Sequence, residues 1–455
     1  MATRARVKRD RLGCEGAVSY PDGDVSRCWV EGETVAGVER VDGWRVVRER
    51  QPRVIKAGMR VNVAVCGVFH HRKYIGELSK RGVLAAFYYS HRRATDAAEL
   101  GMLPERDGGG RAQNLWAKEY LYRGVSKVLG GKMAERIGPM THDLWEGQMM
   151  RRWAECDVFH LMLHGTGLNA LRMAKRKGSR TLGEPVNAHP LVLGRMMETE
   201  HRLLGIAPPP PMRKSERRLV EEISECDALL VASAWIKRSF VEEGYPADKI
   251  HVLPYATDPV HFFPLTAEEK AKAVGSDRRF RVLCVAQLVP RKGQHHLLEA
   301  WKRLALPADE AELVIVGRMS AEMQGVMEKY RGLYTYLPSV AHEALRFEYG
   351  RADVFVLPSV EDGFGLVAVE AMGCGVPVIT TTNAGVADVV EDGRSGFVVP
   401  AGSPDALADR IGHMFRDRSL GVAMGARSLE LSRTTLSWGQ YVDGLVEIYR
   451  KMTGG

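Results

Sequence analysis

Residues 357–379 read LPSVEDGFGLVAVEAMGCGVPVI, and this pattern decides the fold of the second half of the chain. The stretch follows an apolar strand at 353–357, makes a glycine-containing turn at 362–365 and continues as a helix that ends near Gly373. A strand that enters a helix through a glycine turn directs backbone N–H groups above the sheet edge, where they suit a phosphate. The helix N-terminus adds about half a positive charge. The stretch therefore predicts a phosphate site on an α/β sheet.

Three carboxylates flank this turn, at Glu361, Asp362 and Glu370. Carboxylates accept hydrogen bonds from hydroxyl groups, so a phosphate cradle rimmed by acids suits a nucleotide that carries a hydroxyl-rich group. A helix acid is often only a solvated surface group. The position of Glu370 in a helix that begins at the ligand edge favours a binding role.

Strands alternate with helices along most of the chain, which predicts parallel sheets covered on both faces. Helices are expected near 111–129 and 143–155, among others. Two series in tandem predict two Rossmann-like domains with parallel sheets facing across a deep cleft, and ligands beyond the carboxyl ends of the strands. The expected strands are 61–66, 83–88, 157–162, 180–183, 227–232 and 250–253 in the first series, and 280–286, 312–316, 353–357, 376–380 and 396–399 in the second.

A chain of 455 residues is too long for one ordinary core, so two domains are expected. Residues 1–53 show no sustained periodicity and are predicted to be a disordered N-terminal extension. The first domain is placed at 54–257 and the second at 258–435, with a hinge near 254–264. The C-terminal helix, within 436–455, is expected to pack back on the first domain.

The composition is that of a soluble globular protein, with 45% hydrophobic and 26% charged residues. No run approaches the 18 apolar residues of a membrane span, and the basic N-terminus lacks the apolar core of a secretory leader. The seven cysteines form no CxxC pair, which favours reduced thiols. The sequence thus predicts a cytoplasmic protein, with peripheral contact at the inner membrane face as a further expectation.

Charge is distributed unevenly along the chain. Residues 1–250 hold 42 Lys+Arg against 31 Asp+Glu, a balance of +11, whereas residues 251–455 hold 22 against 25, a balance of −3. Basic clusters at 151–152, 172–180 and 213–218 would attract an anionic membrane or nucleic acid, although solvated helix faces are the alternative interpretation. The chain has no recognisable nucleic-acid reading module, so a membrane contact is expected and a nucleic-acid partner is not.

A pair of cations, Arg291 and Lys292, follows the first strand of the second series, just before a helix. Arg grips phosphate oxygens with two donors and Lys adds a point charge. Such a pair alone is commonly a surface feature. Here it falls at the same sheet edge as the 357–379 turn, and the two phosphate-directed features support each other.

Together these motifs resemble the family 4 retaining glycosyltransferases of GT-B fold. The matching segments are QLVPRKGQHHLLEAW (287–301), LVIVG (313–317) and the 357–379 run, supported by SAWI (233–236), IHVLPYATD (250–258) and the glycine and acid pattern over 385–396. The resemblance covers about residues 60–455 and is strongest over 227–416. Each motif alone is weak, and the combination is specific.

The resemblance implies a nucleotide-diphosphate sugar donor held mostly by the second domain. Arg291 and Lys292 would hold the diphosphate, and the N–H groups of Gly365 and Leu366 the distal phosphate. Glu370 would bind the ribose. The family's first acidic position falls on Asp362, with Glu361 as the adjacent alternative. Three further donor-side residues are Phe364 in the turn, Gln287, which stands where members often carry Arg, and Gly67 in the first domain.

On the acceptor side, many family members place a His after the strand that corresponds to 180–183. This chain has Glu184 there, with His189 five residues on, and His160 and His164 end the preceding strand. The acceptor hydroxyl is expected to be oriented by Glu184, His189 or the loop 67–71.

The resemblance implies retention at the anomeric carbon and no metal cofactor. The only DxD motif, Asp22 to Asp24, falls in the extension and is interpreted as incidental. The expected function is transfer of a sugar to a hydroxyl of a glycan or lipid-linked acceptor, in cell-surface polysaccharide or glycolipid synthesis. The alternatives are another GT-B chemistry, a catalytically inactive GT-B scaffold, or a basic nucleic-acid-binding protein.

Overall fold

The computed structural model describes residues 40–41, 44–45, 58–67, 69–91, 100–105, 110–277 and 279–454. The chain forms two compact units, residues 1–55 and 56–455. In the first unit the described residues are two short antiparallel strands, β1 (Arg40–Val41) and β2 (Trp44–Arg45). The extension predicted over 1–53 otherwise lies outside the described residues, as does the DxD motif.

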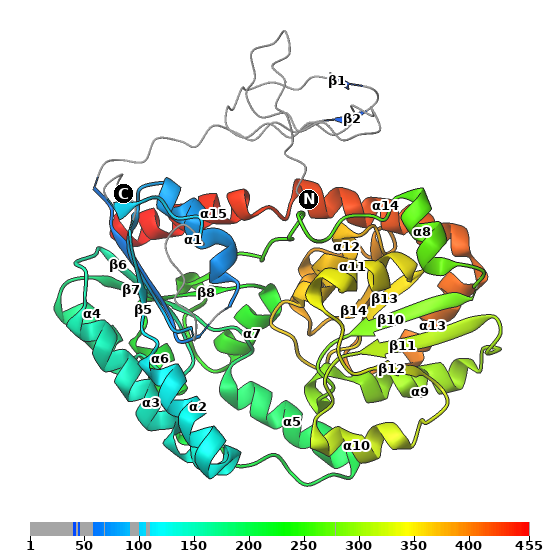
Figure 1. Cartoon of the computed structure of the whole chain (residues 1–455), viewed down its shortest axis with the longest axis horizontal. Coiled ribbons are helices and arrows are strands. Elements are labelled where there is room, and N and C mark those ends of the chain that lie inside the picture. Colours follow the sequence, from blue (N-terminus) through cyan, green and yellow to red (C-terminus); the bar gives the residue numbers. More distant parts are fainter. Residues whose placement is uncertain are drawn as a thin grey trace, which may run out of the picture. The chain divides into compact units, whose positions relative to one another are not determined.

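The first lobe of the larger unit is built on a parallel sheet in the order β5-β4-β3-β6-β7-β8-β9 (Figure 1). Its central strand β3 is buried at every position, as expected for a sheet covered on both faces. The strands are β3 (Val61–Val65), β4 (Leu84–Tyr89), β5 (Arg111–Asn114), β6 (Val158–Met162), β7 (Arg180–Glu184), β8 (Ala228–Val231) and β9 (Ile250–Val252). The helices are α1 (His71–Lys80), α2 (Ala117–Leu129), α3 (Gly131–Arg151), α4 (Leu168–Arg176), α5 (Pro190–Leu204), α6 (Lys214–Glu225) and α7 (Ala234–Glu242), with a 3-10 turn η2 (Ala247–Lys249).

The second lobe repeats this architecture on a parallel sheet in the order β12-β11-β10-β13-β14-β15. Its strands are β10 (Phe280–Val285), β11 (Ala311–Val316), β12 (Thr335–Leu337), β13 (Val354–Leu357), β14 (Val378–Thr381) and β15 (Gly396–Val399). Its helical elements are α8 (Ala267–Val274), η3 (Pro290–Lys292), α9 (Gln294–Leu304), α10 (Ala321–Glu328), α11 (His342–Arg351), α12 (Leu366–Gly373), η4 (Gly385–Asp388), α13 (Pro404–Arg416) and α14 (Arg418–Thr434).

The last helix, α15 (Trp438–Thr453), packs against α1 and β6 of the first lobe (Figure 1). Tyr449 of α15 is fully buried there, and its hydroxyl lies 2.7 Å from Nδ1 of His160 on β6. The chain therefore enters the second lobe after β9 and returns after α14. Among the described residues, no helix combines the length and the apolar character needed to cross a bilayer.

The prediction of a helix over the whole of 111–129 is wrong at its start, because residues 111–114 form β5 and the helix begins at Ala117. The segment Arg-Ala-Gln-Asn is a half-exposed edge strand, so it lacks the apolar run by which buried strands are recognised. The three-residue edge strand β12 and the helices α8 and α14 were not expected either. The two parallel-sheet lobes themselves are confirmed.

One glycine fixes the turn that carries the two cations of the second lobe. Gly293 lies between η3 and α9 with φ +68°, a left-handed conformation that side chains disfavour. A Cβ at this position would collide with the carbonyl oxygen of Pro358, at the end of β13. Glycine therefore lets η3 approach the strand that precedes the 362–365 turn.

We expect Gly293→Ala to lower the free energy of unfolding by about 2 kcal/mol or more, because strain and collision add. Gly124→Ala is the matched control: Gly124 lies inside α2 with no atom near its added Cβ, so the variant should gain about 0.5–1 kcal/mol. Urea denaturation measures both. Equal stability of the two variants would contradict this account of the turn.

Candidate functional site

The turn between β13 and α12 presents unoccupied backbone donors. Gly365 is the residue that caps α12 and has φ +90°, and a Cβ there would lie 2.6 Å from the Leu357 side chain. Within the described part of the chain, no acceptor engages the N–H groups of Gly365 and Leu366. These donors, added to the helix dipole, form an anion site of the kind that the sequence predicts.

The two cations of η3 lie against this turn and are each paired with an acid. Nη1 of Arg291 lies 2.8 Å from Oε2 of Glu361, and Nζ of Lys292 lies 2.5 Å from Oδ2 of Asp362. The guanidinium also donates to the carbonyl of Glu361 at 3.1 Å. The structure therefore brings together the four charged residues that the sequence placed at this edge.

The two adjacent acids have different surroundings. Glu361 is fully buried, and its second oxygen accepts the backbone N–H of Ala188 in the first lobe at 2.9 Å. Both of its oxygens are thus occupied within the protein. Burial alone would raise the pKa of Asp362, but the charges of Lys292 and Arg291 outweigh it and hold that pKa below its usual value. Asp362 is therefore ionised at neutral pH.

The two lobes touch at the same turn. A Cβ on Gly363 would collide with the carbonyl oxygen of Val186, in the loop that follows β7, so only glycine permits this approach. The Gly363 carbonyl accepts the hydroxyl of Ser233 at 3.0 Å, and Arg291 lies 3.4 Å from Oδ1 of Asn187. The loop 185–189 of the first lobe is thus seated directly on the anion site of the second.

Glu370 is not a solvated helix acid. It is largely buried on α12, and its Oε2 accepts the hydroxyl of Tyr349 on α11 at 2.9 Å. Burial raises the pKa of this carboxyl to about 7. The group therefore changes charge near neutral pH, which suits a residue that exchanges hydrogen bonds with a ligand hydroxyl.

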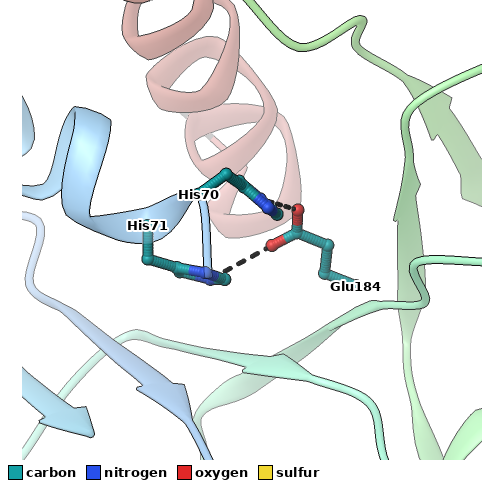
Figure 2. A group of neighbouring side chains, drawn as sticks. All are labelled: His70, His71 and Glu184. Atoms are coloured by element: carbon teal, nitrogen blue, oxygen red, sulfur yellow. Dashed lines mark hydrogen bonds and ion pairs between the residues drawn. The ribbon is translucent and has the colours of Figure 1, made fainter. Parts of the chain in front are cut away.

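Glu184, at the end of β7, lies inside a cluster of histidines. Its Oε1 lies 2.7 Å from Nε2 of His70, and its Oε2 lies 3.3 Å from Nε2 of His71 (Figure 2). The same Oε2 lies 3.1 Å from Nε2 of His160. The hydroxyl of Tyr255 donates to Oε1 at 3.0 Å. Only 1% of the Glu184 side chain is exposed, and the rings of His71 and His160 are fully buried beside it.

The charges within this cluster follow from burial. Burial lowers the pKa of His71 to about 4, so the ring is neutral at neutral pH. Burial also opposes ionisation of Glu184, but its histidine neighbours, His70 foremost, hold its pKa well below the usual range. An ionised carboxylate beside the neutral ring of His71 is a fixed acceptor that orients the ring N–H group.

A line of aromatic rings joins this cluster to the anion site. Phe364 of the glycine turn packs edge-on against Tyr255, with 5.4 Å between ring centroids. Tyr255 in turn lies 4.0 Å from the ring of His70, measured between centroids. The His70 side chain is only 5% exposed and lies against both Glu184 and Tyr255.

Three other predicted residues lie apart from the charged pairs. His189 caps α5, packs edge-on against Phe240 at 5.2 Å and lines a pocket of about 350 Å³ with residues of α6 and α7. Gln287 is exposed after β10, and its carbonyl accepts the side-chain amide of Gln294 at 3.1 Å. Gly67 follows β3 with φ +142°, beside the ring of Phe69, which stacks on His164.

Two groups of described side chains have the composition of a metal site: His70, His71 and Glu184, and Glu200, His295 and His296. In the second group, Oε2 of Glu200 on α5 lies 2.7 Å from Nε2 of His295 and 3.0 Å from Nε2 of His296, both on α9. This carboxylate already joins the two lobes through hydrogen bonds, and Glu184 likewise has its own donors.

Residues 266–430 match the family model described as "Glycosyl transferases group 1". This match covers most of the second lobe. It is 31% identical over 241 residues to a GDP-mannose-dependent alpha-(1-6)-phosphatidylinositol monomannoside mannosyltransferase of Mycobacterium tuberculosis, covering 49% of this chain and 62% of the relative. It is also 31% identical over 260 residues to a D-inositol 3-phosphate glycosyltransferase of Corynebacterium urealyticum, covering 52% and 60%. The chain thus spans about three fifths of these relatives.

Solved structures confirm the GT-B fold. A sucrose-phosphate synthase from Thermosynechococcus elongatus superposes with a TM-score of 0.63 at 18% identity, covering 87% of this chain and all of the other. The Anabaena protein HepE, solved in complex with UDP-glucose, superposes with a TM-score of 0.59 at 16% identity and the same coverage of this chain. The GT-B fold therefore extends over both lobes.

Sequence reasoning missed several residues of this site. Tyr349 sits on an amphipathic helix with nothing to distinguish it from a core residue, and Asn187 and Ala188 act through contacts between lobes that no local pattern encodes. The sequence pattern predicts His70 and His71 only as part of the loop 67–71. A signal was available for them, since the sequence places both directly after the first strand of the glycosyltransferase fold, at the carboxyl edge of the sheet.

Glu370→Gln should raise the thermal midpoint more at pH 8 than at pH 5. The folded-state pKa of about 7 exceeds the ordinary value of 4.5, so the cost of burying the charge is small at low pH and complete above the folded pKa. Glutamine is uncharged at every pH, so the substitution removes that cost. Differential scanning fluorimetry across this pH range, with the exposed Glu343→Gln as control, measures the effect. A pH-independent difference would show that Glu370 is not a buried, titrating group.

Proposed function

We propose that the chain transfers a sugar from a nucleotide-diphosphate sugar to a hydroxyl of a lipid-linked or inositol-containing acceptor. The observation that carries this proposal is the convergence of Arg291, Lys292 and the free N–H groups of Gly365 and Leu366 at one helix N-terminus. Two cations and two backbone donors match the charge and the oxygens of a diphosphate. Glu370 lies one helical turn further along α12, where a ribose would follow.

GDP-mannose is the first donor to consider. The Mycobacterium tuberculosis relative is named for its dependence on GDP-mannose and for a phosphatidylinositol mannoside acceptor, and the Corynebacterium urealyticum relative for an inositol phosphate. Both names include a compound that contains inositol, and the first also names the activated sugar. UDP-glucose, bound in the HepE structure, is the second donor to consider.

The reaction that we propose separates charge in its transition state. The bond between the anomeric carbon and the phosphate oxygen breaks, so negative charge develops on the diphosphate and positive charge on the sugar ring. Arg291, Lys292 and the α12 dipole stabilise the growing negative charge more than the ground state, which lowers the barrier. The acceptor oxygen then bonds to the anomeric carbon, and its proton passes to the departing phosphate oxygen.

The two acids beside the cations have separate parts in this proposal. Glu361 fixes the Arg291 guanidinium and the loop of the first lobe, because both of its oxygens are engaged. Asp362 is buried beside Lys292 but keeps 11% of its side chain exposed, and from there it can meet a sugar hydroxyl. Asp362 therefore takes the part of the first acidic residue, and the configuration at the anomeric carbon is retained.

The acceptor is placed by the histidine cluster of the first lobe. His70 is held by Glu184 and packs at a tilt against Tyr255, which touches Phe364 of the donor turn. An acceptor hydroxyl beside His70 would stand at the junction of the lobes, close to the donor turn. We also propose that transfer needs no metal ion, because Arg291 and Lys292 supply the positive charge that a divalent cation would otherwise bring to the diphosphate.

Nucleotide binding tests this proposal directly. GDP, UDP and ADP and their sugar conjugates are added separately, with and without EDTA, and the thermal midpoint is recorded. A ligand of the native state at 100 times its Kd stabilises by about 2.7 kcal/mol. We expect one nucleotide, GDP first, to raise the midpoint of the wild type equally in EDTA. Lys292→Ala should lose most of that shift relative to its own baseline.

Lys302→Ala is the matched control, since Lys302 is an exposed lysine in the last turn of α9. It should keep the full nucleotide shift. If no nucleotide shifts the wild type, the inactive scaffold becomes the better description of this chain. Tight, salt-sensitive binding to duplex DNA in the absence of any nucleotide shift would instead favour the nucleic-acid alternative.

A further inference from the structure

The helical hairpin formed by α2 and α3 exposes an unusual number of large apolar side chains. Figure 1 shows the two helices packed side by side in the first lobe. No residue of α2 is buried. Val128 is 79% exposed and Leu129 62% exposed at the end of α2, and Met140 is 55% exposed on α3. The other exposed apolar residues of the hairpin are Trp116, Tyr120, Leu121, Tyr122, Met133 and Leu144.

Aromatic and basic side chains share one stripe of α2. Trp116, Tyr120, Arg123 and Lys127 recur at spacings of four, three and four residues, which places them on one face of a helix. Trp116 and Tyr120 pack edge to face, with 5.3 Å between ring centroids. Trp and Tyr beside Arg and Lys are typical of helices that lie in the headgroup region of a bilayer.

The cations of the hairpin differ from those of the basic cluster at 172–180. In that cluster, Arg172 pairs with Glu225 at 2.7 Å and Lys177 with Glu155 at 2.8 Å, so these two charges are neutralised within the protein. Arg123, Lys127 and Arg136 are exposed and have no carboxylate partner among the residues that the structure describes. Residues 116–152 hold seven Lys or Arg against four Asp or Glu.

We propose that the α2–α3 hairpin is a docking surface for an anionic lipid bilayer. Its apolar side chains would enter the headgroup boundary, and its free cations would meet the lipid phosphates. A second copy of the chain fits this surface less well, because two hairpins of the same positive charge would face each other across a dry contact. An apolar face of this extent is otherwise unusual on a soluble lobe.

The hairpin is rooted at the sheet edge that carries the acceptor cluster. Glu119 in the first turn of α2 accepts the hydroxyl of Ser90, which directly follows β4, at 3.0 Å. Parallel strands present their carboxyl ends at one edge, so β4 ends at the same edge as β7 with Glu184. A bilayer held by the hairpin would therefore lie near the lobe edge that receives a lipid-linked acceptor. The docking itself does not depend on the proposed transfer reaction.

Co-sedimentation of the full chain with vesicles tests the proposal. Vesicles of phosphatidylcholine alone are compared with vesicles that contain one third phosphatidylglycerol, at low and high salt. We expect binding to the anionic vesicles and its weakening by salt. Val128→Ser with Leu129→Ser should lower the affinity at least about tenfold, since two apolar contacts of this size exceed 1.4 kcal/mol. Arg123→Glu with Lys127→Glu should abolish the preference for anionic vesicles.

Two substitutions in the second lobe are matched controls. Val422 is 77% exposed, which is similar to the exposure of Val128. Lys329 is exposed and has no carboxylate partner within the described ranges. Val422→Ser and Lys329→Glu should bind like the wild type. Equal loss in controls and hairpin variants, or a dimer that the hairpin variants disrupt, would overturn the proposal. Nucleotide-induced stabilisation should survive in every variant, so failure of docking is distinguishable from failure of the donor site.

Discussion

The ion pairs Arg291–Glu361 and Lys292–Asp362 are the interaction on which the rest of the site depends. They place two cations against the N-terminus of α12, where like charges and a helix dipole would otherwise repel one another. The acids that neutralise them come from the turn that precedes the helix. Glu361 also holds the backbone of Ala188, so the same carboxylate that fixes a cation fixes the position of the opposite lobe.

This arrangement explains why the lobes touch at a glycine. The loop after β7 approaches so near to Gly363 that any side chain would collide with Val186. The loop begins directly after Glu184, whose carboxylate is fixed by histidines and by Tyr255. Two buried carboxylates, Glu361 and Glu184, therefore hold the two ends of one short segment. Glu361 is hydrogen-bonded at both oxygens and Glu184 at Oε1, and these bonds offset part of the cost of burying the two charges.

Much of this site could be predicted from the sequence, because it depends on local patterns. The glycine turn, the helix that follows it and the cation pair each have a short-range signature, and parallel sheets bring strand ends to one edge. The roles of individual acids could not be predicted in this way. Glu361 and Asp362 are neighbours in sequence, and only the fold shows that one is enclosed by the other lobe. Glu184 matches a family position, but its burial among three histidines depends on β3, β6 and β7 together. Short edge strands such as β5 escape detection because they lack a buried face.

A crystal structure of the chain with its preferred nucleoside diphosphate would show whether the N-terminus of α12 is the donor site. We expect diphosphate oxygens within hydrogen-bonding distance of Arg291, Lys292 and the backbone N–H groups of Gly365 and Leu366, with the ribose hydroxyls at Glu370. The Arg291–Glu361 pair should persist, because it also holds the first lobe. A nucleotide bound elsewhere, with both ion pairs unchanged and the α12 N-terminus free of phosphate, would show that this sheet edge is not the donor site.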